Sequence, residues 1–488
     1  MRKTRIFDTK VQEIKYKVLC EVSKQTWEGN DSFAAFNDIA KVVVTKEDTT
    51  RCCIYKERAV VAERIKIALG GNKNDPNVVE VIDIACDECP EAGYVVTDLC
   101  RGCLAHRCRD ACKFGAIVFD EHLKAKIDKS KCVECGRCAS VCPYRAIYNF
   151  VRPCERSCKT GAIHMSESGA AEINPEKCTD CGECVYTCPF GAVVDKSYIV
   201  DAINLIKESR KEPYYEVYAI MAPAVASQFT YASFGQVITA MKKIGFDGVM
   251  ETALGADMVS EMEAKELVEK GFLTSSCCPA FVKYIEQKFP ALRDKVSSTL
   301  SPMATLGKAI KEKDPTSKVI FIGPCTAKKA EFLKPEVRPY IDCVLTFEEL
   351  QALIDSMEID IENLEETVLD EASCFGREYA FSGGVTAAVA QAVKELAEKE
   401  GPESPYGKFE LKPTICDGIE KCRPALARAA KGVLDSNFIE GMACEGGCIG
   451  GAGCLTHGNK NKDAIIRHSC EAYRRTVTDY GNLENLGK

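Results

Sequence analysis

Two near-copies of one cysteine run constrain this chain more than any other feature. Both copies follow the pattern C-x2-C-x2-C-x3-C, and a proline follows each of them. This spacing is typical of iron–sulfur ligands, whereas zinc sites do not need such a triple run, so clusters are favoured over zinc. The runs lie at Cys132, Cys135, Cys138 and Cys142 and at Cys178, Cys181, Cys184 and Cys188.

Length and composition indicate a multidomain protein of a reducing compartment. The chain has 488 residues, too many for one core, and 30 cysteines. No apolar segment follows its basic start, and no apolar run approaches the ~18 residues that span a bilayer. The net charge of −8 argues against nucleic-acid binding. We therefore expect a cytoplasmic protein with no membrane span and no nucleic-acid partner.

The cysteine distribution divides the chain into three regions. Residues 1–85 hold three cysteines, residues 86–200 hold sixteen, and residues 201–488 hold eleven. The first region is an extension of unknown role, in which Ile54–Leu69 has a helical apolar rhythm and the adjacent Cys52 and Cys53 are expected to be idle thiols. The sixteen clustered cysteines predict an electron-transfer module.

The third region alternates between strand and helix patterns. Tyr215–Ile220 and Lys318–Ile322 are typical of short buried strands, and Val385–Leu396 predicts a helix with an alanine-rich face. This mixture predicts a large α/β domain. The expected fold class is therefore an α+β and α/β multidomain protein, with a duplicated cluster module before the α/β domain.

A second repeated segment supports the duplication. Cys-x3-Cys-Lys-x-Gly-Ala-Ile begins at Cys108 and again at Cys154, once before each run. Together these repeats resemble the bacterial two-cluster ferredoxin, in which three cysteines of a run hold one [4Fe–4S] cluster and the fourth crosses to the other. The resemblance implies three ligand sets: Cys112 with Cys132, Cys135 and Cys138; Cys142 with Cys100, Cys103 and Cys108; and Cys158 with Cys178, Cys181 and Cys184.

Four cysteines are left over by this assignment. Cys86 and Cys89 lie upstream of the repeats, and Cys154 and Cys188 lack two partners in the second copy. The four together would hold a fourth cluster, while a mononuclear metal or free thiols are the alternatives for Cys86 and Cys89. We therefore expect three to four accessory [4Fe–4S] clusters.

The segment around the first cysteines of the repeat is basic. Between Cys100 and Lys131 there are eight Lys or Arg residues against four Asp or Glu residues. This charge predicts either a docking face for an acidic electron carrier or a solvated surface that balances the negative charge of the clusters.

Three separated motifs in the third region carry a further resemblance. They are Ser276-Cys277-Cys278-Pro279, Pro324-Cys325-Thr-Ala-Lys328-Lys329, and Glu440-x-Met442-Ala-Cys444-x-Gly-Gly-Cys448. In this order they resemble the three signatures of the [FeFe]-hydrogenases, and the resemblance extends over residues 86–488. It implies an H-cluster, which joins a [4Fe–4S] cubane to a two-iron unit with CO, CN⁻ and a bridging azadithiolate.

The same resemblance implies a role for individual residues. Cys278, Cys325, Cys444 and Cys448 would hold the cubane, and Cys448 would bridge to the two-iron unit. Cys277 would relay protons, because a thiol beside an electron-rich group can gain and lose a proton. Lys328 would donate a hydrogen bond to a cyanide ligand. Pro223 and Met442 would contact the cofactor, Lys329 is expected at the surface, and Cys454 is expected outside the site.

A proton relay is also implied. Glu263, Glu266 and Lys270 are spaced to share one face of a predicted helix over residues 255–270. With Ser297, they resemble the family's relay, which would run Lys270, Glu266, Ser297, Glu263 and Cys277. The alternative is a charged helix face that only meets water.

Several positions depart from the family pattern. Lys270 stands in place of an arginine, and the others are Gly323 for methionine, Met303 for glutamine, Ala224 for serine and Phe281 for tryptophan. They indicate a monomeric, group B-like member.

We therefore expect an [FeFe]-hydrogenase that interconverts protons and H2. Its partners would be a ferredoxin or similar electron carrier and the maturation proteins for the two-iron unit. A H2 sensor and a non-catalytic iron–sulfur assembly protein are the alternatives. The 488 residues contain no PAS-like or kinase-like region, and Cys277 and Lys328 favour the enzyme.

Overall fold

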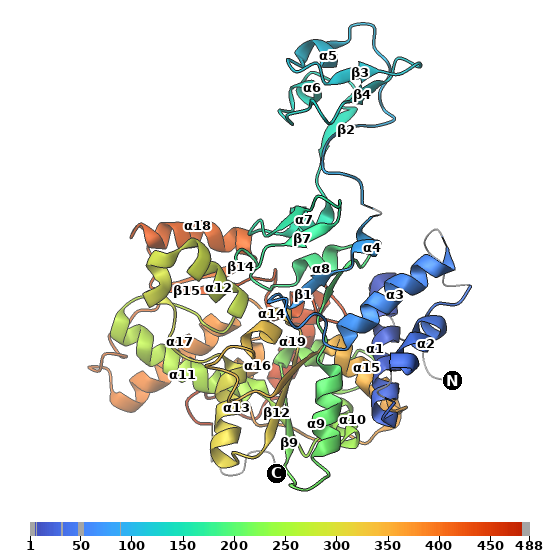
Figure 1. Cartoon of the computed structure of the whole chain (residues 1–488). Coiled ribbons are helices and arrows are strands. Elements are labelled where there is room, and N and C mark those ends of the chain that lie inside the picture. The colour runs from blue at the N-terminus through green and yellow to red at the C-terminus, as the bar shows by residue number, and fades with distance from the viewer. Residues whose placement is uncertain (1–4, 6, 31–32, 47–52, 88, 481–488) are drawn as a thin grey trace.

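The computed structural model describes residues 5, 7–30, 33–46, 53–87 and 89–480 (Figure 1). A large lower body carries most of the helices, and a small lobe stands above it on a narrow neck. None of the helices in these residues is long and apolar enough to cross a membrane.

Three helices of the N-terminal region pack against the large body. They are α1 (Lys10–Glu28), α2 (Phe33–Val43) and α3 (Ile54–Ala68), and α3 matches the predicted helix closely. Cys53 is exposed and immediately precedes α3, while Cys52 lies outside the described residues. Lys15 of α1 forms ion pairs of 2.5 Å with Asp195 and with Glu348, so this region is tied to both of the following regions.

Two ferredoxin-like modules follow, and one is inserted into the other. The inner module, residues 79–89 and 153–195, begins with β1 (Val79–Val81), which pairs antiparallel with its last strand, β8 (Val193–Asp195). The outer module, residues 93–150, is closed in the same way by β2 (Gly93–Val96) and β5 (Ile147–Phe150). The predicted boundary at residue 86 therefore divides the inner module, because β1 lies before it.

The short elements of the two modules correspond. The inner module contains α4 (Asp83–Cys86), α7 (Pro153–Ser157), β6 (Ile163–Met165), β7 (Ala171–Ile173) and α8 (Glu183–Thr187). The outer module contains α5 (Arg107–Ala111), β3 (Ile117–Phe119), β4 (Ala125–Ile127) and α6 (Arg137–Ser140). The outer module is the upper lobe of Figure 1, and the inner module lies between it and the large body.

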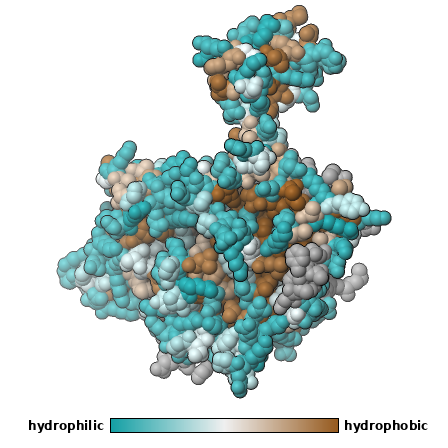
Figure 2. All heavy atoms as spheres, viewed as in Figure 1, coloured by the Kyte–Doolittle hydropathy of each residue, from teal (hydrophilic) through white to brown (hydrophobic). Residues whose placement is uncertain are grey.

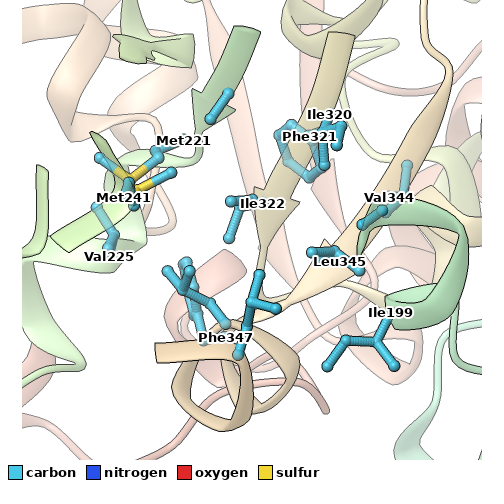
Figure 3. Packing of buried hydrophobic residues seen from close by; sticks show 14 of the residues in the cluster. Ile199, Met221, Val225, Met241, Ile320, Phe321, Ile322, Val344, Leu345 and Phe347 are labelled. Carbon is cyan, nitrogen blue, oxygen red and sulfur yellow. The ribbon is translucent and has the colours of Figure 1, made fainter. Parts of the chain in front are cut away.

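The large body is built on two parallel sheets, which confirms the predicted α/β domain. The first has the order β10-β9-β12-β13 and the second the order β11-β15-β14. Figure 3 shows the first sheet from close by, with Ile322 of β12 between Phe347 below it and Ile320 at the far end of the strand. Phe347 is fully buried, which contributes about 1.5–3 kcal/mol. The strands are β9 (Val217–Met221), β10 (Gly248–Glu251), β11 (Leu273–Thr274), β12 (Lys318–Gly323), β13 (Cys343–Thr346), β14 (Pro413–Asp417) and β15 (Phe438–Met442).

Helices surround these sheets. They are α9 (Ile199–Glu208), α10 (Phe234–Ile244), α11 (Thr252–Lys270), α12 (Pro279–Lys288), α13 (Pro302–Lys313), α14 (Thr326–Glu331), α15 (Phe347–Ser356), α16 (Cys374–Glu378), α17 (Gly384–Glu400), α18 (Ile419–Ala430) and α19 (Lys460–Glu471), with the 3-10 turns η1 (Pro223–Ser227), η2 (Pro290–Lys295), η3 (Ile361–Asn363) and η4 (Cys448–Gly450).

Strand ends position the candidate site. Pro223 follows β9, the Cys277-Cys278 pair follows β11, Cys325 follows β12, and Cys444 follows β15. All four strands lie in parallel sheets, and ligands of such sheets bind at the carboxyl ends of the strands. The three cysteine motifs, far apart in sequence, therefore meet at one edge of the fold.

Candidate active site and cluster sites

A cavity of about 70 Å³ lies where these strand ends meet. Its wall is mainly apolar, and the exceptions include Cys277, Lys328 and one cysteine of the predicted cubane set, Cys448. The wall includes five predicted residues, Pro223, Cys277, Lys328, Met442 and Cys448, and also Met303, Phe321 and Tyr379.

The four predicted cubane ligands are brought together beside this cavity. Cys278 and Cys325 occupy the N-cap positions of α12 and α14, and Cys448 opens η4. Burial raises the pKa of Cys325, and the nearby Cys278 and Cys448 raise it further. Burial also raises the pKa of Cys444, with Cys325 as its strongest thiol neighbour. Four partly buried thiols that share one place suit a cationic iron group, which would release their protons on binding.

The donor type of the candidate site suits an iron–sulfur cluster. Four cysteine thiolates hold a [4Fe–4S] cubane, and the site supplies Cys278, Cys325, Cys444 and Cys448. Within the described residues, no group of three or more His, Cys, Asp or Glu side chains is placed to hold one metal ion.

The two lysines of the second motif have different partners. Lys328 reaches the cavity wall, and its Nζ donates to Glu331 Oε2 at 2.6 Å. Burial alone would lower the pKa of Lys328, but the ion pair with Glu331 raises it, so the side chain stays charged. The expectation that Lys329 lies at the surface is wrong: it is fully buried and forms ion pairs of 2.8 Å with Asp195 and with Glu349.

Cys277 and Glu263 form the inner end of the predicted relay. Burial raises the pKa of Cys277 well above its usual value, and the neighbouring Glu263 is the next cause. Burial also raises the pKa of Glu263 to about 7, against hydrogen bonds from Ser276 and Ser297. Oε2 of Glu263 is buried and has no hydrogen-bond partner in the described part of the chain. Glu263 can therefore gain and lose a proton near neutral pH.

Hydrogen bonds connect this carboxyl group with the protein surface. Lys270 Nζ donates to Glu266 Oε1 at 2.5 Å, and Ser297 Oγ donates to Glu266 Oε2 at 3.0 Å. From Ser297, the hydrogen bonds continue to Thr299 Oγ1 at 2.8 Å and from there to Ser276 Oγ at 3.1 Å.

Two hydroxyl groups outside the predicted relay also connect Ser297 to Glu263. Ser276 Oγ donates to Glu263 Oε1 at 3.3 Å, so Thr299 and Ser276 join Ser297 to Glu263. Both hydroxyl groups were missed, because the resemblance assigned a role to neither Thr299 nor Ser276. The closeness of Ser276 to Cys277 in the chain is the one signal that was available.

Two further cavities lie in the ferredoxin-like modules. A cavity of about 310 Å³ is lined by all four cysteines of the predicted set Cys158, Cys178, Cys181 and Cys184. Another of about 300 Å³ is lined by the predicted set Cys100, Cys103, Cys108 and Cys142. In the third set, burial raises the pKa of Cys138, and the nearby thiols of Cys132 and Cys112 raise it further. Cys135 of this set is exposed.

The inner module touches the active-site motifs directly. Thr326, next to Cys325, donates to the backbone carbonyl of Asp180 at 2.7 Å. A Cβ atom on Gly182 would lie 2.4 Å from Thr326 Oγ1, so this contact requires glycine. The cavity of Cys178, Cys181 and Cys184 therefore adjoins the four cysteines of the predicted cubane set.

Glycines at the site have a role that the sequence did not predict. Because glycine has no Cβ atom, the glycines around Cys448 can either make room for a bulky group or let two backbone segments approach each other. A Cβ atom on Gly447 would meet the backbone of Ser382 at 2.7 Å, and one on Gly451 would meet the carbonyl of Pro324 at 2.4 Å. They therefore allow close contact between protein segments.

One departure from the family pattern is explained by another glycine. A Cβ atom on Gly441 would lie 2.1 Å from the ring of Phe281, so the phenyl ring occupies that space.

Cys454 is buried, and its thiol donates to the backbone carbonyl groups of Cys448 and Ile449, away from the cavity wall.

Comparison with known proteins shows what this chain is similar to. Residues 215–452 match the model for the C-terminal domain of the iron-only hydrogenase large subunit. Residues 125–148 match a 4Fe–4S binding domain, and residues 152–192 match a 4Fe–4S dicluster domain. A solved structure of a Chlamydomonas reinhardtii [FeFe]-hydrogenase variant aligns with a TM-score of 0.47 and 21% identity, over 58% of this chain and 90% of that one.

Two curated relatives come from different functional classes. Iron hydrogenase 1 of Clostridium pasteurianum is 29% identical over 68% of this chain and 65% of its own length. The cytosolic Fe–S cluster assembly factor NAR1 of Eremothecium gossypii is 25% identical over 47% of this chain and 64% of its own length. The chain thus spans less than two thirds of either relative. It is a hydrogenase-like iron–sulfur protein that joins ferredoxin-type 4Fe–4S domains to an iron-only-hydrogenase C-terminal domain.

Proposed function

We propose that this protein is an [FeFe]-hydrogenase that catalyses 2H⁺ + 2e⁻ ⇌ H2. The observation that carries the proposal is the hydrogen-bonded path from exposed Lys270 to the buried carboxyl group of Glu263, beside Cys277. A protein that only assembles or carries clusters has no need to bring protons to a closed cavity. A hydrogenase needs such a path at every turnover.

The chain's own residues fit the proposed cofactor. Cys278, Cys325, Cys444 and Cys448 would hold the cubane, with Cys448 as the bridge to the two-iron unit with its CO, CN⁻ and azadithiolate ligands. When bound, this H-cluster supplies the reversible combination of protons and electrons. Lys328 places a buried positive charge in the cavity wall, where an anionic ligand is stabilised. Pro223 and Met442 contribute apolar wall that excludes water.

Proton transfer follows this chain of hydrogen bonds. A proton that arrives at Glu266 passes to Ser297, Thr299, Ser276 and then Oε1 of Glu263, as each hydroxyl group accepts one proton and donates another. Glu263 then gives a proton from its unpartnered Oε2 to Cys277 as the Cys277 thiol gives up its own proton toward the cavity, and H2 oxidation reverses the sequence. Rotation of the hydroxyl groups resets the chain.

Electrons would enter from a ferredoxin or a similar soluble carrier and pass through the accessory clusters. The contact between Thr326 and Asp180 supports this route, because it brings the segment of Cys178, Cys181 and Cys184 next to Cys325 of the proposed cubane set. Maturation proteins would supply the two-iron unit.

An assembly role is the second candidate, favoured by the similarity to the NAR1 factor. Infrared spectroscopy after exposure to the two-iron unit separates the two roles. The enzyme shows CO and CN⁻ bands and produces H2 from reduced methyl viologen, whereas an assembly protein shows neither. Replacement of Cys277 by alanine should abolish H2 production and keep the bands, and the exposed Cys470 provides a control, Cys470→Ala. Fast H2 production by Cys277→Ala would remove Cys277 from the relay.

A further inference from the structure

The four cysteines left over by the sequence pattern occupy one place in the inner module. Cys86, Cys154 and Cys188 are buried in the same core cluster. Burial raises the pKa of Cys154 to about 12, and Cys188 and Cys86 are the next causes. Burial also raises the pKa of Cys89, and the nearby Cys86 and Cys188 raise it further. All four thiols therefore lie within electrostatic reach of one another.

Their surroundings repeat those of an equivalent set in the outer module. The backbone N–H of Ala171 donates to Cys86 Sγ at 3.3 Å, as the N–H of Ala125 donates to Cys100 Sγ at 3.4 Å. Cys188 and Cys142 both accept from the alanine four residues later, at 3.3 Å. Each pair stands at the same position in its module. The first set thus corresponds to Cys100, Cys103, Cys108 and Cys142, which line one cavity.

A buried arginine adds an independent observation. Arg152 is only 2% exposed, and its NH1 lies 3.9 Å from Cys86 Sγ. Its other contacts go to the carbonyl oxygens of Pro90, Cys89 and Gly169 at 2.9–3.4 Å. The guanidinium group is always charged, and none of these partners carries a compensating formal charge. A buried charge of this kind calls for an anion, and a thiolate-ligated cluster is one.

We propose that Cys86, Cys89, Cys154 and Cys188 hold a fourth accessory [4Fe–4S] cluster and that Arg152 is its charge partner. This proposal concerns the electron route of the proposed hydrogenase. Cys89 precedes the inserted outer module in the chain and Cys154 follows it, and Figure 1 shows that this module joins the rest of the protein through the narrow neck. The cluster would therefore take one electron at a time from the outer module and pass it to the cluster of Cys158.

Iron counting on the full-length protein, before any two-iron unit is added, tests the site. Five cubanes, one of them at the active site, give about 20 irons per chain, and four give about 16. Cys89→Ala and Cys188→Ala should each lower the count by about four irons, while Cys470→Ala should not. A parent count of about 16 that is unchanged in Cys89→Ala would overturn the proposal. Because no H2 assay is involved, this result is independent of the proposed activity.

The role of Arg152 is tested by redox titration followed by EPR. Arg152→Gln removes the charge and should lower the midpoint potential of one accessory cluster, because the reduced cluster loses a stabilising cation. Arg152→Lys should restore most of the potential. Arg156→Gln removes the same charge from an exposed position of the neighbouring helix and should leave all potentials unchanged. Equal shifts in Arg152→Gln and Arg156→Gln would refute the pairing, even if the cysteine variants fold poorly.

Discussion

The proton route and the electron route reach the same cavity but are built from different units. The proton route is a line of single side chains, in which successive groups from Lys270 to Glu263 lie 2.5–3.3 Å apart. The electron route is a repeated module, with one copy inserted into the other. Protons move only between groups in hydrogen-bond contact, whereas electrons tunnel through protein. One missing hydroxyl group therefore breaks the first route, while the second can lengthen by duplication.

The largest effect should come from the inner end of the proton route. Glu263→Gln keeps the shape of the side chain but cannot exchange a proton, so H2 production should fall about 10²–10⁴-fold. Reduction of the iron–sulfur clusters by dithionite, followed by EPR, should stay normal. Glu269→Gln, at an exposed position of the same helix, is the control. Turnover of Glu263→Gln within a factor of two of the parent would mean that protons enter elsewhere.

The electron route should tolerate a far larger change. Gly93 and Phe150 are paired residues of β2 and β5, so a short Gly-Ser linker can replace residues 93–150. The shortened protein should lose about eight irons and keep the rest. Methyl viologen should still drive H2 production within about twofold of the parent, because a small donor can reach the inner module, while ferredoxin-driven production should fall at least about tenfold.

Loss of all iron from the shortened protein would contradict this separation. It would show that the inner module needs the outer one to fold. A salt series with ferredoxin as donor gives a second check, because docking on the basic outer module weakens as ionic strength rises.

What the sequence could predict depends on how local each feature is. The C-x2-C spacings and the strands β9 and β12 are set by neighbouring residues, so the fold class and the gathering of cysteines were within reach. The burial of Lys329 was not, because it depends on Asp195 and Glu349, which come from other parts of the chain. Two lysines in a row look alike until their partners are known.

The nested modules escaped prediction for a related reason. Cys86 and Cys89 precede the outer module and Cys154 follows it, so the inner site is split by an insertion of about sixty residues in sequence. The pairing of β1 with β8 shows that both pieces belong together. Thr299 was missed because the resemblance assigns no role to its position, although its hydroxyl group lies between Ser297 and Ser276.

The middle of the proton route should be sensitive to a single hydroxyl group. Thr299→Val keeps the volume and removes the link between Ser297 and Ser276, so H2 production should fall about tenfold, as expected for one lost hydrogen bond. Thr299→Ser restores the hydroxyl group and should recover the rate. The protonation of Glu263 after a pH jump, followed by infrared spectroscopy, should be slower in Thr299→Val but not in Thr299→Ser. An unchanged protonation rate would show that water bypasses Thr299.

The smallest effect should come from the outer end, where the route meets solvent. Burial tends to raise the pKa of Glu266, but hydrogen bonds from Lys270 and Ser298 lower it overall. Lys270→Gln should therefore raise this pKa and move the acidic limb of the pH–rate profile to higher pH. Because Glu266 is partly exposed and an ion pair of this kind contributes about 1 kcal/mol or less, the rate at neutral pH should change by less than about fivefold.

Lys270→Arg tests whether the positive charge or the lysine side chain itself matters at this position. It keeps the positive charge beside Glu266 and introduces the residue that stands at this position in the family pattern. Both the rate and the pH profile should therefore stay unchanged. A large loss in Lys270→Gln that Lys270→Arg rescues would mean that Lys270 steers protons into the route rather than only setting the pKa of Glu266. The contrast between the proton route and the electron route would then weaken at the outer end of the proton route. A surface charge would limit the proton supply there as strongly as the buried chain of hydroxyl groups.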